Sequence, residues 1–116
     1  MRRFMLLLYV LVLMPSLALA QSFFTSLPDV PLMPGLIELE DRALSFDKPE
    51  GRILIGVAAA DDSVSRESVQ SYYSQSLPAF GWRESGPYSY VRGLETLELS
   101  LQNDGAQNIL EITISP

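Results

Sequence analysis

The sequence predicts an α+β domain in which a single helix packs on a mostly antiparallel sheet, in the order ββαββββ, after an extended proline-rich arm. Three observations support this fold. The apolar residues of 65–80 recur at helical spacing, several other runs alternate apolar and polar residues like half-buried strands, and turn sequences separate these runs. We therefore expect three parts: an export signal at 1–20, the arm at 21–37 and one domain at 38–116.

The first 20 residues have the features of a cleavable export signal. Met1-Arg2-Arg3 is positively charged, 4–14 is an uncharged apolar run, and Ala18 and Ala20 are the small residues that signal peptidase requires before a cut at Ala20-Gln21. As a helix rising about 1.5 Å per residue, that run is shorter than the roughly 30 Å hydrocarbon core, which disfavours a retained anchor. We expect a periplasmic or secreted protein that meets the membrane only through its signal before cleavage.

Composition limits the partners and the chemistry of the exported part. Removing 20 of the 116 residues takes away two of the eight basic residues and none of the 14 acidic ones, so the net charge changes from −6 to −8. This balance argues against nucleic acid and anionic membrane surfaces as partners. The chain has no Cys and no His, which removes disulfides, Ser-His and Cys-His nucleophile pairs and the usual zinc or haem ligands. We expect no enzyme activity, no catalytic residue, no cofactor and no metal.

The remaining polar clusters do not change that expectation. A Ser-Lys dyad would need Lys48, the single lysine, but it lies in an acidic turn sequence where it should stay charged. Glu95 and Glu98 are three residues apart in a predicted strand and therefore point to opposite faces, unlike a glycosidase pair. Asp61-Asp62 precedes the helix and is interpreted as a loop and capping cluster, with calcium binding as the alternative although no EF-hand spacing is present.

The arm at 21–37 contains Pro28, Pro31 and Pro34, which force an extended path and exclude a helix or a central strand. Its apolar side chains have two interpretations. They lie over an apolar face of their own domain, or they form a partner-binding segment, because extended proline-rich chains lose little entropy on docking. The candidate arm residues are Leu27, Val30, Leu32, Met33 and Leu36.

Two runs, 42–46 and 52–60, are predicted to form a hairpin around the turn at 48–51. Leu44 and Phe46 share one side of the first strand. The second strand is apolar on both sides, so we expect it to be central and covered twice, by the helix on one face and by the arm on the other.

The helix at 65–80 is expected to begin at a Ser65 cap and to end before Gly81, with a kink or an early stop at Pro78. Four strands should follow it as a meander: 82–84, 88–92, 95–102 and 108–115. The last two alternate regularly around Asn103-Asp104-Gly105, which is a strong hairpin turn.

Aromatic residues are concentrated at the end of the helix and in the hairpin after it. If they faced solvent, Tyr73, Trp82, Tyr88 and Tyr90 would form a platform for sugar rings or a peptide. The competing interpretation places them in the core, because a small domain without disulfides needs large buried side chains.

Three stretches of the chain carry a resemblance: 29–36 (DVPLMPGL), 46–53 (FDKPEGRI) and 69–82 (VQSYYSQSLPAFGW). Together they resemble a group of small uncharacterised exported proteins of Gram-negative bacteria, which implies a periplasmic setting. The group has no known activity, so the resemblance assigns no functional residue. The third stretch also resembles, more loosely, helix-to-strand junctions of envelope lipoproteins, but this chain lacks their lipid-accepting Cys.

From these observations we expect an accessory or binding module that recognises a protein or another envelope component through the arm, a sheet face or an edge strand. The alternative is a small-ligand or glycan-binding domain that uses exposed aromatic rings. Exposure of the arm and of the aromatic residues discriminates between the two.

Overall fold

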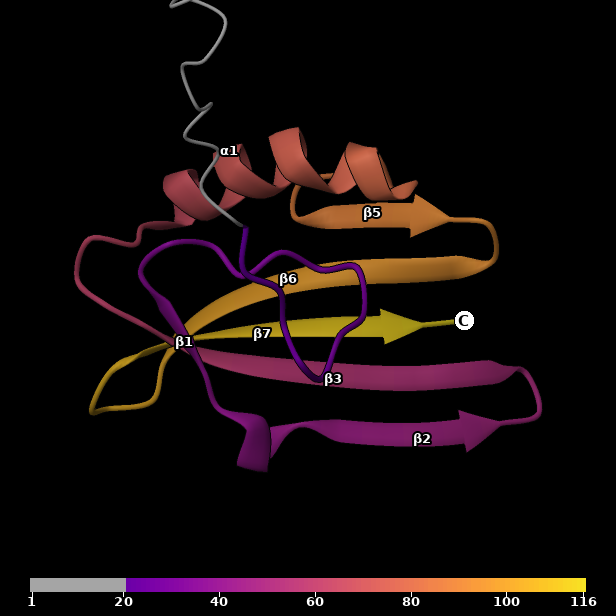
Figure 1. Cartoon of the computed structure of the whole chain (residues 1–116), viewed down its shortest axis with the longest axis horizontal. Helices are drawn as coiled ribbons and strands as arrows, with labels where there is room; N and C mark the ends of the chain where they lie inside the picture. Colours follow the sequence, from indigo (N-terminus) through magenta and orange to yellow (C-terminus); the bar gives the residue numbers. More distant parts are fainter. Residues whose placement is uncertain (1–20) are drawn as a thin grey trace, which may run out of the picture.

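The computed structural model describes residues 21–116, so the predicted signal at 1–20 and its residues Ala18 and Ala20 lie outside the described part (Figure 1). It confirms the α+β class, with one α-helix on an antiparallel sheet of seven strands in the order β1-β3-β7-β6-β5-β4, where β2 also pairs with β3. The strands are β1 (Leu36–Glu38), β2 (Leu44–Lys48), β3 (Gly51–Ala60), β4 (Arg83–Gly86), β5 (Ser89–Arg92), β6 (Glu95–Asn103) and β7 (Asn108–Ser115). Strand β1 was not predicted and begins inside the segment assigned to the arm.

Two short strands share one edge of β3. Strand β1 pairs with its last residues, Ala58–Ala60, and β2 pairs with its first half, from Gly51 to Ile55. A 3-10 turn at Glu40–Arg42 separates the two short strands. The predicted hairpin of β2 and β3 is therefore confirmed, with its turn at Pro49-Glu50.

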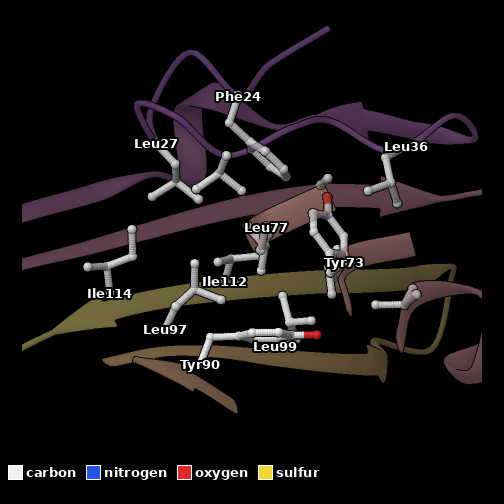
Figure 2. Packing of buried hydrophobic residues seen from close by; sticks show 14 of the residues in the cluster. Phe24, Leu27, Leu36, Tyr73, Leu77, Tyr90, Leu97, Leu99, Ile112 and Ile114 are labelled. Carbon is white, nitrogen blue, oxygen red and sulfur yellow. The ribbon is translucent and has the colours of Figure 1, made fainter. Parts of the chain in front are cut away.

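The core lies on one face of the sheet, which we call the inner face. Alternate residues of the three central strands point into it, and all are nearly or fully buried: Leu54, Ala58, Ala60, Leu97, Leu99, Leu110, Ile112 and Ile114. Figure 2 shows part of this layer packed against the arm above it and against Tyr73 and Leu77. Strands that alternate inward apolar residues with outward residues thus build a single apolar layer.

Helix α1 (Arg66–Ser76) begins and ends as its sequence predicts. The Ser65 side chain accepts from the Ser68 backbone N–H, and Ser68 Oγ accepts from the Ser65 N–H, which completes a capping box. A 3-10 turn at Leu77–Phe80 contains Pro78, and Gly81 ends it with φ of +89°. The helix stops before Pro78 because proline supplies no backbone donor to continue it.

The arm folds back on itself and covers the inner face. Phe24 N–H donates to Val30 O at 2.9 Å, Leu32 N–H donates to Ser22 O at 2.8 Å, and the resulting loop crosses the sheet over β3, β7 and β6 (Figure 1). Its side chains Phe24, Leu27 and Val30 are at most 3% exposed. The arm is therefore part of the core of its own domain.

The expectation that β3 is covered on both faces is wrong. Arm and helix lie on the same face, since Tyr73 of α1 donates a hydrogen bond from its hydroxyl to the Pro31 carbonyl at 2.7 Å. Gly56 lets the arm approach β3 directly: a Cβ there would lie 2.7 Å from Leu27 Cγ. The core cluster of the described residues, 21–116, contains none of the residues on the opposite side of the sheet, and we call that side the open face.

Candidate functional site

The candidate aromatic platform does not form, and the competing interpretation, in which these rings lie in the core, accounts for most of them. Tyr73 and Tyr90 are 0% exposed and Trp82 is 2% exposed, whereas Tyr88 is half-buried against the core. Figure 2 shows Tyr73 and Tyr90 inside the apolar layer. Three of the four candidate rings therefore have no exposed surface for a sugar or a peptide, and they provide the large core side chains that a small domain requires.

The environment of these rings is structural. Burial raises the pKa of Tyr73 above its usual value and that of Tyr90 to about 12, so both hydroxyls stay protonated at neutral pH. The Arg92 guanidinium lies over the Trp82 ring at 4.3 Å and donates to Phe80 O at 3.0 Å. This cation-π contact connects β5 to the end of the helix.

The candidate arm residues are also largely buried. Leu27 and Val30 are 0% exposed and Leu36 is 7% exposed, so they pack against their own sheet. Leu32 and Met33 are half-buried and line a cavity of about 440 Å³ together with Leu36, Gln21 and Tyr72. The interpretation in which the arm covers its own domain therefore accounts for most of its apolar content.

The Glu38 carboxylate holds the arm in place, a role that the sequence did not indicate. Glu38, at the end of β1, accepts from the backbone N–H groups of Thr25 at 2.6 Å and Ser26 at 3.0 Å, and from the Ser26 hydroxyl at 2.7 Å. Burial alone would raise the pKa of Glu38, but these hydrogen bonds outweigh it and hold this pKa below its usual value of 4.5.

This carboxylate predicts an acid dependence of stability. The pKa of Glu38 is lower in the folded state than in the unfolded state. Its contribution to the free energy of unfolding is therefore fully present above the usual pKa and is lost as the pH falls through the pKa of the folded state. We expect the free energy of unfolding to fall below about pH 4.5, and less steeply in Glu38→Gln. Urea unfolding between pH 3 and 7 measures this. The pKa values of Asp61 and Glu95 are also lowered, so the Glu38→Gln variant should keep part of the pH dependence of stability. If stability fell equally steeply with pH in the variant and the wild type, the role of Glu38 would be contradicted.

The open face carries the exposed apolar surface that the structure leaves without a partner. On the two edge strands, Ile37 is 71% exposed, and Leu44 and Phe46 are each 50% exposed. Their register places them beside open-face residues of β3, since Leu44 is opposite Ile55, Phe46 is opposite Ile53, and Ile37 is opposite Ala59. We call this group the apolar strip: Ile37, Leu44, Phe46, Ile53, Ile55, Val57, Ala59 and Ile109. Within it Val57 and Ile109 are buried, with 6% and 9% exposure, so the accessible part of the strip lies along its β1 and β2 edge.

The rest of the open face is polar and acidic. On β6 and β7 the same face presents Glu98 opposite Thr113 and Ser100 opposite Glu111. The one cationic residue of β2 is Lys48, which lies at the turn to β3. The strip therefore lies between a free strand edge and an acidic surface.

Other charged groups belong to the scaffold. Arg52 donates to Glu95 at 2.9 Å and 3.2 Å, and this hydrogen-bonded pairing lowers the pKa of Glu95. Arg92 lies 3.7 Å from the same carboxylate and 3.9 Å from Asp29 of the arm. This network of ion pairs links β3, β5, β6 and the arm. The Glu95 carboxylate is therefore engaged in holding these elements together.

The described residues, 21–116, contain no group of three acidic side chains placed to hold a metal ion. Within that range no helix is long and apolar enough to cross a bilayer. No protein-family model, curated protein or solved structure matches the chain. The apolar strip is the candidate site that the geometry of the described residues supports.

Proposed function

We propose that this chain is an exported, non-enzymatic binding module that recognises a protein partner through the apolar strip of its open face. The observation that supports this proposal is the exposure of Ile37, Leu44 and Phe46 along one edge of the open face, while the inner face packs against the arm and α1. Exposed apolar residues that are contiguous and bordered by polar groups are typical of interaction sites. Leader-like residues 1–20 and the resemblance to exported proteins support a periplasmic setting.

The negative charge around the strip indicates what kind of partner surface would fit it. Glu98 and Glu111 border the strip, and the exported chain has a net charge of −8. A partner surface with an apolar centre and Lys or Arg along one side would match both features. The buried rings of Tyr73, Trp82 and Tyr90 give the glycan-binding alternative no comparable surface.

The proposal predicts that an acidic substitution in the strip abolishes partner binding without unfolding the domain. We expect Ile37→Asp to reduce partner recovery at least about tenfold, because it places a charge on the most exposed residue of the strip. The measurement is site-specific photo-crosslinking in intact cells with a probe at position 55, followed by quantification of the crosslinked partner.

Leu94→Asp is the matched control. Leu94 is 93% exposed in the turn between β5 and β6, away from the strip, so the same change in chemistry should leave recovery unaltered. Equal loss in both variants, or no crosslink at position 55 in the wild-type chain, would show that the strip is not the binding surface.

A further inference from the structure

We propose that a second copy of this chain pairs with the free edge of β2, antiparallel and about a two-fold axis at Phe46, so that the two sheets become one. This inference goes beyond the proposed function, because it concerns the strand edge and holds whether or not a partner occupies the open face. It rests on three properties of β2: its exposure, its hydrogen-bonding pattern and its side-chain order.

The edge of β2 is accessible. All five of its residues are exposed, and within residues 21–116 it pairs with β3 alone. Its register with β3 is regular from Leu44 to Lys48, whereas the opposite sheet edge, β4, carries a bulge between Glu84 and Gly86. Bulges protect an edge from pairing, and β2 has none.

The backbone pattern selects which residues face outward. Lys48 pairs with Gly51 across the two-residue turn Pro49-Glu50, and the residues that flank such a turn exchange both hydrogen bonds. Alternation then directs the backbone groups of Phe46 toward β3, and those of Ser45 and Asp47 toward solvent. These two residues supply the donors and acceptors for another strand.

A two-fold axis at Phe46 brings these groups together. Ser45 lies opposite the partner's Asp47, and Asp47 opposite the partner's Ser45, so outward-facing residues meet outward-facing residues. On the open face Phe46 lies opposite the partner's Phe46, and Leu44 lies opposite the partner's Lys48. Aromatic pairs of this kind stabilise cross-strand contacts, and no like charges are directly opposed.

Neighbouring registers fit less well. Moving the axis to Asp47 opposes two aspartates and brings in Pro49, which has no N–H to donate. Moving it to Ser45 leaves Lys48 unpaired and requires Ala43, which precedes the strand. The register about Phe46 alone pairs all five residues of β2 without opposing like charges.

The resulting unit carries one continuous apolar surface. Both open faces lie on the same side of the joined sheet, so the two apolar strips meet at the Phe46 pair. Two five-residue strands bury less than the roughly 1,200 Å² of a stable interface, and both chains are acidic. We therefore expect a weak dimer that added salt strengthens, since salt screens the repulsion.

Single-cysteine variants test the register directly, because the natural chain contains no cysteine. Residues at a non-hydrogen-bonded pair have Cα atoms about 4.5 Å apart, within the range of a disulfide, so Phe46→Cys should form a covalent dimer on oxidation. Leu44→Cys is the matched control, because the Leu44 and Phe46 side chains are each 50% exposed. In the proposed register, the two thiols introduced at position 44 would lie four residues apart along the strands, or about 13 Å. We expect at least about tenfold faster crosslinking of Phe46→Cys, from this distance difference. Equal rates, or faster crosslinking of Leu44→Cys, would overturn the register.

Charge substitutions at Ser45 provide a second test without thiols. The lysine of Ser45→Lys would face the partner's Asp47 and tighten the dimer, whereas the aspartate of Ser45→Asp would repel the partner's Asp47 and weaken the dimer. Because the pair occurs twice in the symmetric dimer, we expect each variant to change the Kd by about fivefold. Sedimentation equilibrium of the full exported chain measures both, and the exposed position preserves the fold. Shifts in the same direction, or a wild-type chain that stays monomeric at millimolar concentration, would overturn the proposal.

The two proposals fail separately. Ile37 lies on β1, so Ile37→Asp should abolish partner crosslinking and leave the sedimentation of the chain unchanged. Ser45 points to the other side of β2, so Ser45→Asp should weaken the dimer and leave the apolar strip intact.

Discussion

Replacing Gly56 with alanine is expected to lower the free energy of unfolding by about 1–3 kcal/mol, the usual cost of overpacking a core. The added Cβ would lie 2.7 Å from Leu27 Cγ, closer than real Cβ contacts, and Leu27 is 0% exposed. The side chain cannot rotate into solvent without lifting the arm from β3. Urea unfolding followed by the fluorescence of Trp82 measures the change.

A double-mutant cycle identifies the cause. Leu27→Ala alone should cost about 2–5 kcal/mol through lost burial and the cavity left behind, but it also makes room for the new methyl group. The double variant Leu27→Ala/Gly56→Ala should therefore be more stable than the sum of the single effects predicts. Strict additivity would show that the two positions do not meet.

Gly86→Ala serves as the glycine control. A Cβ at Gly86 would meet nothing within 4 Å, so that substitution tests the general effect of removing a glycine from a strand. We expect a change within about 0.5 kcal/mol, as for other open surface positions. A loss as large as that of Gly56→Ala would contradict the steric explanation.

Tyr73→Phe is expected to lower the free energy of unfolding by about 1–3 kcal/mol. The Tyr73 hydroxyl donates to Pro31 O at 2.7 Å inside the core, and phenylalanine would leave that carbonyl without this donor. This bond joins the arm to α1, so its loss should also increase hydrogen exchange of the Phe24 and Leu32 amides, which bond within the arm. Chemical denaturation and amide exchange measure the two effects.

The adjacent tyrosine supplies the control. Tyr72 packs edge-on against Tyr73, with ring centroids 5.0 Å apart, but its hydroxyl accepts an exposed hydrogen bond from Gln21 at 3.0 Å. Tyr72→Phe removes the same atom at the surface and should change stability by less than about 0.5 kcal/mol. If the two variants lost equal stability, the buried hydrogen bond would not be the cause.

Local patterns were sufficient for most of the secondary structure. The regular alternation of 95–102 and 108–115 predicted β6 and β7, and the Ser65 cap, Pro78 and Gly81 predicted the limits of α1. Strand β1 was missed because it has three residues, follows a proline-rich segment and forms only through pairing with the end of β3. Short edge strands have too little sequence to show a period.

The candidate site was predicted only in part. Alternation placed Leu44 and Phe46 on one side of a strand, but nothing in that strand shows whether its apolar side faces a core or solvent. The aromatic cluster was open to both interpretations for the same reason, and packing placed Tyr73, Trp82 and Tyr90 inside. The role of Glu38 in holding the arm was not recognised, because its partners, Thr25 and Ser26, are positioned by the fold of the arm.

The sequence by itself determined the α+β class, the absence of His and Cys chemistry and the positions of most elements, because these depend on composition and on contacts between near neighbours. Only the tertiary structure decided that the arm and α1 share one face of the sheet. Both faces of β3 are apolar, so its sequence is compatible with a cover on either side. The approach of Leu27 to Gly56 and the Tyr73 bond to Pro31 select one side, and this choice leaves the other face of the sheet open.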